Sequence, residues 1–428
     1  MGIASSVASR GNEEIVSQKD PQRINVLFIC DEWNSSKGGL STFNREAAIN
    51  LAKTSSDKIK VHCYVTQSHE SERKDARESG VNIITARTIP GASNPLEWLR
   101  LPPKELSHPD IVIGHGRKFG TPAYCIVETR NCKWVQFVHV FCEDLGKYKQ
   151  KDENINSDTI EENEKKHKEE IKLCKAANVV VAVGSRLQQK YKNCLPNVDV
   201  NILTPGILEN FCHLSDQRLQ RVTDSGNSEE FSIFVFGRAA SEDLVLKGYD
   251  IIADAIGSLG DKFKVTFVGA PEGQYENIQK WFLENTSITR RQLTIRGYCD
   301  QDELKAMFYE SDLVVLPSRT EGFGLVTLEA ISAGIPVLVT AESGIAKALE
   351  KVEGGKSVIV KSEDTKEWSR KIQKLSKQKP EKRHKNAILL RKNYKKTYSW
   401  SIQCKRFQEM IVEPLMKDSC HADSVSGM

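Results

Sequence analysis

The sequence lacks the features that mark membrane-spanning and nucleic-acid-binding proteins. No apolar run reaches the roughly 18 residues that a membrane-spanning helix needs. The 61 Lys and Arg nearly balance the 57 Asp and Glu, so the formal net charge is only +4. Nucleic-acid-binding domains are usually far more basic, and we therefore expect no nucleic-acid partner. With 428 residues, 39% of them hydrophobic, the chain is expected to form two or three globular domains.

The 11 cysteines form none of the patterns that indicate a metal site or a disulfide framework. There is no C-x-x-C pair and no Cys/His cluster with the spacing of zinc ligands. Their odd number, and the places of Cys30, Cys63 and Cys174 in or beside apolar stretches, favour reduced core thiols. Since no apolar signal-peptide core stands near the N-terminus either, we expect a cytoplasmic protein.

The N-terminus carries one modification motif. Residues 1–6 read MGIASS and match M-G-x-x-x-[ST], the pattern for N-myristoylation of Gly2. A chance match in a flexible tail is the alternative interpretation. One myristoyl chain binds membranes only marginally, and the nearby Arg10 and Lys19 form no polybasic patch. The motif therefore predicts no more than a weak peripheral association with membranes.

Hydrophobic patterning divides the chain into two similar α/β halves. Apolar runs typical of strands buried on both faces alternate with helical patterns. In the first half these runs cover residues 24–30, 59–66, 110–113, 134–138, 178–183 and 200–203. In the second half they cover residues 231–236, 264–269, 292–296, 312–316, 336–340 and 357–361. This alternation predicts two doubly wound parallel sheets, each covered by helices on both faces.

The same patterns predict the domain boundaries. We expect a flexible tail over residues 1–23 and a first domain over 24–212. Residues 213–230 are polar, lack apolar periodicity and are interpreted as a linker. The second domain is expected over residues 231–396.

In doubly wound sheets ligands bind beyond the carboxyl ends of the strands, so the residues there are the first candidates for a site. Gly38 and Gly39 follow the first strand and would let the backbone approach a ligand closely, although a tight turn is the alternative. His139 directly follows the run 134–138, and His115 stands in the analogous place one strand earlier. A neutral imidazole there can donate or accept a hydrogen bond, but each histidine alone is more often structural.

Two cations stand at the corresponding edge of the second domain. Gly237 and Arg238 end its first strand, and Lys247 follows after a polar loop. Arg can bind phosphate oxygens through two donors, and Lys adds a point charge, so the pair would suit a diphosphate. On these residues alone, ordinary surface cations are an equal alternative.

The most informative stretch reads PSRTEGFGLVTLE, at residues 317–329. Glu321 lies in the predicted loop and Glu329 about two turns into the next helix, at most roughly 12 Å away. Gly322 and Gly324 would let the backbone come close, and the helix N-terminus would favour a phosphate between the two carboxylates. Because carboxylates bind vicinal hydroxyls, the stretch predicts an elongated ligand with a sugar at one carboxylate, a ribose at the other and a diphosphate between them.

With these motifs the sequence resembles the retaining glycosyltransferases of family 4, from about residue 24 to 416. Glu321 and Glu329 are spaced as in the E-x7-E motif of that family. The segment AGIPV at 333–337 comes shortly after this motif, as a similar segment does in the family. The segment TPGI at 204–207 is similar to the family's hinge-proximal segment. The resemblance implies the GT-B fold, in which two Rossmann-like domains face a central cleft. It also implies a C-terminal helix over residues 397–418 that crosses back to the first domain, followed by a tail over 419–428.

The resemblance further implies roles for single residues. Glu321 would bind hydroxyls of the donor sugar, and Glu329 would bind the ribose. Arg238 and Lys247 would bind the diphosphate, and His139 would lie beside the anomeric carbon. The implied catalytic residues are His139, Glu321, Arg238 and Lys247. The other implied donor-binding residues are Gly38, Gly39, Gly237, Tyr298, Gly322, Phe323, Gly324 and Leu325.

The implied function is retaining transfer of a hexose from a nucleotide-diphospho-sugar to an acceptor that the sequence does not identify. No metal and no cofactor are expected, because Arg238 and Lys247 would supply the positive charge. One departure is Lys347, which stands where the family often has Glu. A catalytically inactive sugar-nucleotide-binding regulatory module on the same fold is the alternative, and a phosphorylase that uses inorganic phosphate is a third.

Overall fold

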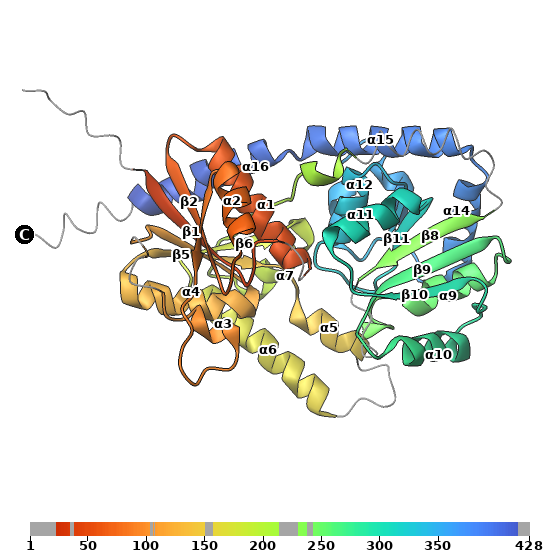
Figure 1. Cartoon of the computed structure of the whole chain (residues 1–428), viewed down its shortest axis with the longest axis horizontal. Coiled ribbons are helices and arrows are strands. Elements are labelled where there is room, and N and C mark those ends of the chain that lie inside the picture. The colour runs from red at the N-terminus through yellow and green to blue at the C-terminus, as the bar shows by residue number, and fades with distance from the viewer. Residues whose placement is uncertain are drawn as a thin grey trace, which may run out of the picture.

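The computed structural model describes residues 23–34, 38–102, 106, 108–149, 157–213, 230–237 and 243–417. Two parallel sheets form two domains that lie side by side (Figure 1). Gly2 with its motif, and Arg238, lie outside the described residues. Within the described part of the chain, every helix is too short or too polar to cross a membrane.

The first domain is built on a seven-stranded parallel sheet with the order β3-β2-β1-β4-β5-β6-β7. All six strands predicted for this half are present, and the sheet has one more. The additional strand is β3, with the sequence VNIIT, which lies at the sheet edge and is only partly buried. The strands are β1 (Ile24–Ile29), β2 (Ile59–Val65), β3 (Val81–Thr85), β4 (Ile111–His115), β5 (Lys133–Val138), β6 (Val179–Val183) and β7 (Val200–Leu203).

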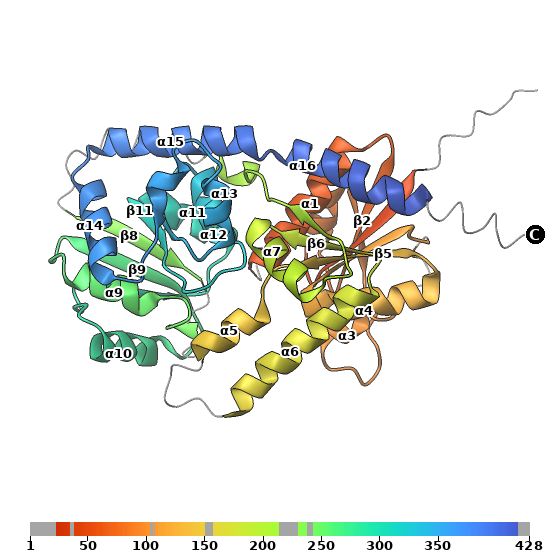
Figure 2. The same cartoon turned by 180° about the vertical axis from the view of Figure 1, so that it is seen from behind.

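Among the described residues of the first domain, seven α-helices connect these strands and cover the two faces of the sheet (Figures 1 and 2). They are α1 (Gly39–Thr54), α2 (Glu70–Glu78), α3 (Pro95–Trp98), α4 (Gly116–Arg130), α5 (Cys142–Lys149), α6 (Ser157–Ala176) and α7 (Ser185–Cys194).

The second domain has a six-stranded parallel sheet with the order β10-β9-β8-β11-β12-β13, and it contains every strand predicted for it. The strands are β8 (Phe231–Phe236), β9 (Phe263–Ala270), β10 (Leu293–Gly297), β11 (Leu313–Leu316), β12 (Val337–Thr340) and β13 (Ile359–Val360). The helices are α9 (Tyr249–Gly257), α10 (Tyr275–Asn285), α11 (Gln301–Glu310), α12 (Leu325–Ser332), α13 (Gly344–Leu349) and α14 (Thr365–Ser376). Because β8 and β11 are neighbours, the loops after them meet at one edge.

The chain then returns to the first domain. Helix α15 (Pro380–Thr397) runs along the second domain, and α16 (Trp400–Phe407) lies on the first, packed against α1 (Figures 1 and 2). At the crossing, the Tyr394 hydroxyl donates to the Pro205 carbonyl at 2.9 Å. A Cβ on Gly206 would lie 2.6 Å from the backbone nitrogen of Trp400, so only glycine fits there. The predicted architecture of two parallel-sheet domains with a C-terminal crossover is therefore confirmed.

Candidate active site

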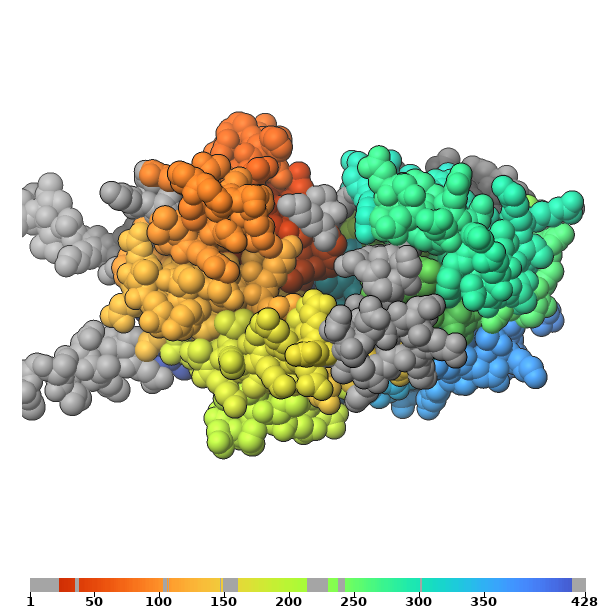
Figure 3. Space-filling model, turned by 90° about the horizontal axis from the view of Figure 1, so that it is seen from below, coloured from red at the N-terminus to blue at the C-terminus, as the bar shows by residue number. Residues whose placement is uncertain are grey.

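A cleft of about 860 Å³ lies between the carboxyl ends of the two sheets. Figure 3, which views the molecule from below, shows a recess where the two domains meet. The volume is in the range of small-molecule sites. Of the residues predicted for the site, the cleft is lined by Gly38, Gly39, His139, Gly237, Lys247, Tyr298, Glu321, Phe323, Gly324 and Leu325. Gly322 and Glu329 belong to the same loop and helix but do not line it, and the place of Arg238 is not described.

Lys247 and Glu321 form an ion pair at the centre of the second-domain wall. Lys247 Nζ lies 2.7 Å from Glu321 Oε2, although the two residues are 74 positions apart. Lys247 stands two residues before α9, and the intervening Gly248 has a φ of +66° and packs against the Pro317 carbonyl. A side chain at Gly248 would collide with that carbonyl, so glycine lets the two loops touch. An anion entering the cleft would meet Lys247 already held beside a carboxylate.

The N-terminal tip of α12 fits closely against the first domain. A Cβ on Gly322 would lie 2.0 Å from the His139 carbonyl oxygen, and one on Gly39 would lie 3.1 Å from Leu325 Cδ1. Gly324 caps the helix with a φ of +96°. The glycines thus allow backbone contact between the domains, and they leave the unpaired amides of the first helical turn beside the cleft.

Three buried polar groups behind this tip have no hydrogen-bond partner among the described residues. They are Ser318 Oγ, Thr327 Oγ1 and Glu329 Oε2. Glu329 is only 5% exposed, and burial raises the pKa of its carboxyl to about 8. An unpaired buried polar group costs about 1–3 kcal/mol. Ser318 lines the cleft, and Thr327 and Glu329 lie on α12, whose N-terminal tip lines it, so these groups are candidates for binding a ligand there.

His139 is held by a chain of hydrogen bonds that starts in the core of the first domain. Asn44 donates to Cys63 Sγ through Nδ2, and its Oδ1 lies 3.0 Å from His115 Nε2. His115 Nδ1 in turn lies 3.0 Å from His139 Nε2. This network assigns the protons to Nε2 of both rings and leaves Nδ1 of His139 as an acceptor.

Burial also sets the charge of the two histidines. It lowers the pKa of His139 to about 3 and that of His115, which also faces His139, well below its usual value. Both rings are therefore neutral at physiological pH, and His139 can orient a ligand but not supply positive charge. The sequence singled out both histidines, but no local pattern pointed to Asn44.

The first-domain wall holds functional candidates that sequence reasoning missed. Glu170, on α6, is 2% exposed, and burial raises the pKa of its carboxyl to about 7. Lys118 lies 2.5 Å from Asp31, which stands two residues after the end of β1. The one sequence feature that could have indicated Glu170 is the high density of charged residues in α6, but such a density is equally typical of an exposed helix. The further polar residues of this wall are Arg117, Asn163 and Lys166.

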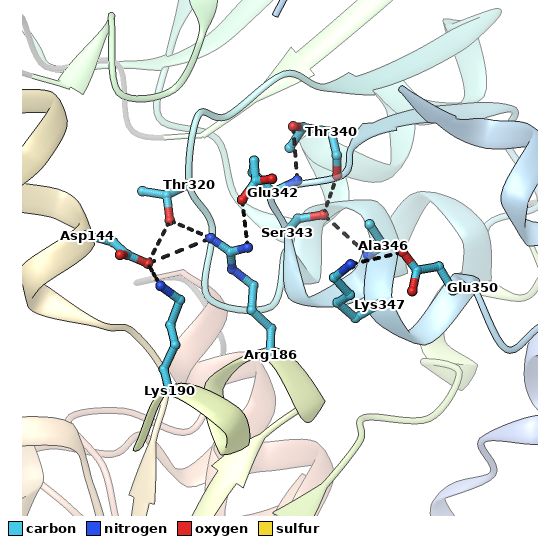
Figure 4. A network of polar contacts seen from close by, with 10 residues as sticks. All are labelled: Asp144, Arg186, Lys190, Thr320, Thr340, Glu342, Ser343, Ala346, Lys347 and Glu350. Atoms are coloured by element: carbon cyan, nitrogen blue, oxygen red, sulfur yellow. Dashed lines mark hydrogen bonds and ion pairs between the residues drawn. The ribbon is translucent and has the colours of Figure 1, made fainter. Parts of the chain in front are cut away.

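A polar network joins the two domains beside the cleft (Figure 4). Arg186, on α7, lies 2.8 Å from Glu342 Oε2 of the second domain and 3.3 Å from Thr320 Oγ1. The Thr320 hydroxyl also lies 3.4 Å from Asp144 Oδ2 on α5. Lys347 points away toward Glu350, 3.0 Å from it, and does not line the cleft. The network therefore braces the loop that carries Glu321.

Metal ligation has no geometric support in the part of the chain that the structure describes. No group of three or more His, Cys, Asp or Glu there could hold a metal ion. The expectation that the protein needs no metal remains a prediction.

Known structures share this architecture. A sucrose-phosphate synthase from Thermosynechococcus elongatus superimposes with a TM-score of 0.69 at 15% identity, over 92% of this chain and 100% of that one. The Anabaena protein HepE, crystallised with UDP and glucose, superimposes with a TM-score of 0.64 at 16% identity, over 91% of this chain and 100% of that one. At these identities the likeness shows the fold, which is that of the GT-B glycosyltransferases.

Sequence comparison adds the family. A D-inositol 3-phosphate glycosyltransferase from Paenarthrobacter aurescens is 28% identical over 185 residues, which are 42% of this chain and 41% of the relative. The chain thus matches less than half the length of such relatives. The family model described as family 4 glycosyltransferase in conflict systems matches residues 27–407, nearly the whole chain. The protein therefore belongs to the family 4 glycosyltransferases, in the group described for conflict systems.

Proposed function

We propose that the protein transfers a hexose, with retention of configuration, from a nucleoside-diphospho-sugar to an acceptor hydroxyl. The observation that carries this proposal is the Lys247–Glu321 pair beside the amide-rich tip of α12, in a cleft shared by two domains. A neighbouring structure holds UDP and glucose, which makes UDP-glucose the first donor to test.

The donor would lie along the second-domain wall. Its diphosphate would bind Lys247 and the amides at Leu325 and Val326, where the helix dipole favours negative charge. Glu321 would then release Lys247 and accept hydrogen bonds from the sugar hydroxyls. At the other end the ribose would reach Glu329, and the base would lie near Tyr298, a residue that is 63% exposed.

Arg238, Gly38 and Gly39 complete the proposed donor site. Gly38 and Gly39 line the cleft from the first domain, opposite the α12 tip. Gly237 lines it from the second domain, and Arg238 is the next residue in the sequence. We propose that Arg238 adds a second cation on the diphosphate.

The chemistry follows from the charges at these positions. Breaking the bond between the anomeric carbon and the diphosphate oxygen places negative charge on the leaving group. Lys247 and the helix amides would stabilise that charge because they are already oriented toward it. His139 is neutral, so it would hold a sugar hydroxyl through a hydrogen bond. Closure of the two domains around the donor would limit its hydrolysis by water.

Donor turnover tests the proposal. UDP-glucose and other nucleotide sugars are offered with an acceptor panel that includes inositol phosphates, and NMR of the product reads the anomeric configuration. We expect turnover with retention, and a loss of about 100-fold or more in Lys247→Ala and in Glu321→Ala. Lys347→Ala is the matched control, because Lys347 is paired with a glutamate outside the cleft. Full activity in both cleft variants would contradict the assignment.

A non-catalytic sugar-nucleotide-binding module is the second candidate. It is favoured by Lys347, which replaces the Glu common in similar enzymes, and by the direct pairing of Lys247 with Glu321. It predicts that nucleotide sugars raise the melting temperature of the protein but are never consumed. Transfer of sugar to any acceptor would exclude it.

A further inference from the structure

The second domain carries a strongly basic surface outside the cleft. Residues 365–397, which include α14 and α15, contain thirteen Lys or Arg and only two Glu. The whole chain has a net charge of only +4, so its remaining residues are net negative. Ordinary soluble surfaces mix charges of both signs, and this segregation calls for an anionic partner.

The outer side of α15 presents the lysines as a single stripe. Lys382, Lys385, Leu389, Lys392 and Lys396 fall within about 80° around the helix axis at 3.6 residues per turn. Leu389 is 54% exposed at the centre of this stripe. No carboxylate among the described residues lies within ion-pair distance of these four lysines, whereas the neighbouring Lys395 pairs with Glu209 at 2.6 Å.

A cavity of about 730 Å³ opens beside this stripe, between α14, α15 and the segment before β13. Its apolar floor includes Val358, Leu375 and Leu390. Glu353 is the one acidic side chain among its lining residues, and the cationic lining residues are Lys356, Arg370, Lys371, Lys374 and Arg383.

Of these cations, only Arg383 has a carboxylate partner among the described residues, Asp312 at 2.8 Å. Burial and the nearby charges of Arg370 and Lys374 lower the pKa of Lys371. The cavity therefore gathers five cations above an apolar floor, with two carboxylates nearby, Glu353 in its lining and Glu367 beside Lys371.

We propose that the stripe and the cavity, together the α14–α15 basic surface, dock on a bilayer that contains anionic phospholipids. Headgroup phosphates would lie against the lysines and in the cavity, and Leu389 would enter the boundary with the acyl chains. Clusters of four to eight cations next to an apolar side chain are typical of such surfaces.

The composition of the stripe favours lipid over nucleic acid. Its cations are all lysine, whereas the bidentate donors that read phosphates and bases in nucleic acids come mainly from arginine. Residues 365–397 expose no large aromatic side chain on which a base could stack, and Leu389 is their one large exposed hydrophobic residue. A leucine at the centre of a lysine stripe loses its contact with water when it enters a lipid boundary.

Docking in this orientation would leave the cleft accessible. Helix α15 runs along one long edge of the molecule, and α5 and α6, which line the cleft, lie on the opposite side in both views (Figures 1 and 2). The basic surface can thus bind a membrane whether or not the cleft is occupied, and the proposal does not depend on the proposed reaction.

Vesicle co-sedimentation of the unacylated full chain tests the proposal. We expect binding to phosphatidylcholine vesicles that contain a third phosphatidylserine, none to pure phosphatidylcholine, and release at high salt because exposed charges are screened. The double variant Lys385→Glu, Lys392→Glu should bind more weakly by about fivefold or more for each lysine. Leu389→Ser should weaken binding several-fold without changing its salt dependence.

The matched control is the same charge reversal at Lys165 and Lys172, two exposed lysines of α6 on the opposite side of the molecule. Thermal melting shows whether each variant is folded. Equal binding by the α15 variant and this control, or no binding to anionic vesicles at low salt, would overturn the proposal. Binding to duplex DNA or RNA, with no binding to vesicles, would overturn it in favour of a nucleic-acid surface.

Discussion

Arg186 of the first domain and Glu342 of the second form an ion pair of 2.8 Å beside the cleft (Figure 4). The Glu321 backbone amide donates to the Glu342 carbonyl at 3.0 Å, and Arg186 also contacts Thr320. The loop that carries Glu321 is therefore held on one side by its own domain and on the other by its neighbour. Closure of the domains and placement of Glu321 are physically coupled.

Arg186→Gln should loosen this coupling. We expect the donor KM to rise several-fold, and the ratio of donor hydrolysis to sugar transfer to increase, because a less tightly closed cleft admits water. Both are measured by comparing donor consumption with product formation. Lys192→Gln on the same helix is the control, since Lys192 is exposed. A hydrolysis ratio equal to that of the wild type would contradict the coupling.

Glu329→Gln should stabilise the protein at alkaline pH. Burial raises the pKa of Glu329 to about 8, well above its ordinary value of 4.5. Below pH 4.5 the carboxyl is protonated in both the folded and the unfolded protein, so its raised pKa costs no stability. Between pH 4.5 and 8 it ionises readily only in the unfolded protein, so the free energy of unfolding falls as the pH rises. The variant cannot ionise, so its advantage in folding free energy should grow through this range to about 5 kcal/mol.

Thermal melts across the same pH range measure this effect, with the exposed Glu350→Gln as control. The stabilised variant should also bind nucleoside diphosphates more weakly, if Glu329 holds the ribose. Parallel stability curves for wild type and variant would show that Glu329 does not titrate as described.

The ring of His139 should stay neutral from physiological pH down to about pH 4. Burial lowers its pKa to about 3, and the bond to His115 places the proton on Nε2. Nitrogen NMR of the imidazole reads both the charge and the tautomer. His115→Phe should remove the acceptor for that proton, redistribute the tautomers and lower kcat more than it changes the donor KM. A His139 titration near its usual value of 6.5 would contradict the assigned network.

Gly322→Ala should force the domains apart. The added methyl group would lie 2.0 Å from the His139 carbonyl oxygen, and neither backbone can yield easily. We expect a larger radius of gyration by small-angle scattering and a loss of activity. Gly146→Ala is the control, because its methyl group would meet Asn163 Cβ at an ordinary 3.6 Å. An unchanged radius and full activity would show that the contact adapts.

The sequence predicted the sheets well because their buried strands are continuous apolar runs. The strand that was missed is β3, a short edge strand in which the exposed Asn82 interrupts the apolar residues and the last two residues are only partly buried. Helix α6 was difficult for another reason. Most of its charged residues are exposed, so the sequence does not distinguish the buried Glu170 from them. Apolar patterning thus predicts which segments form strands and helices, but it does not show which polar side chains, such as that of Glu170, face the interior.

The candidate site could be predicted only in part, for a related reason. Strand ends indicate which residues reach a sheet edge, so Lys247 and Glu321 were found separately. Their pairing depends on β8 and β11 being neighbours, which is a property of strand order. Arg186 and Glu342 meet only because two independently folded sheets pack together, and no local pattern carries that information.

The two connections between the domains lie against each other. Pro205 and Gly206, which leave the first domain, are held by Tyr394 and Trp400, which belong to the returning segment. Because these two connecting segments are in contact, the domains can rotate about the line along which the segments lie. The same contact opposes sliding or twisting of one domain against the other. The two domains should thus rotate about this line, and the parts farthest from it, at α6 in the first domain and α10 in the second (Figures 1 and 2), should move the greatest distance.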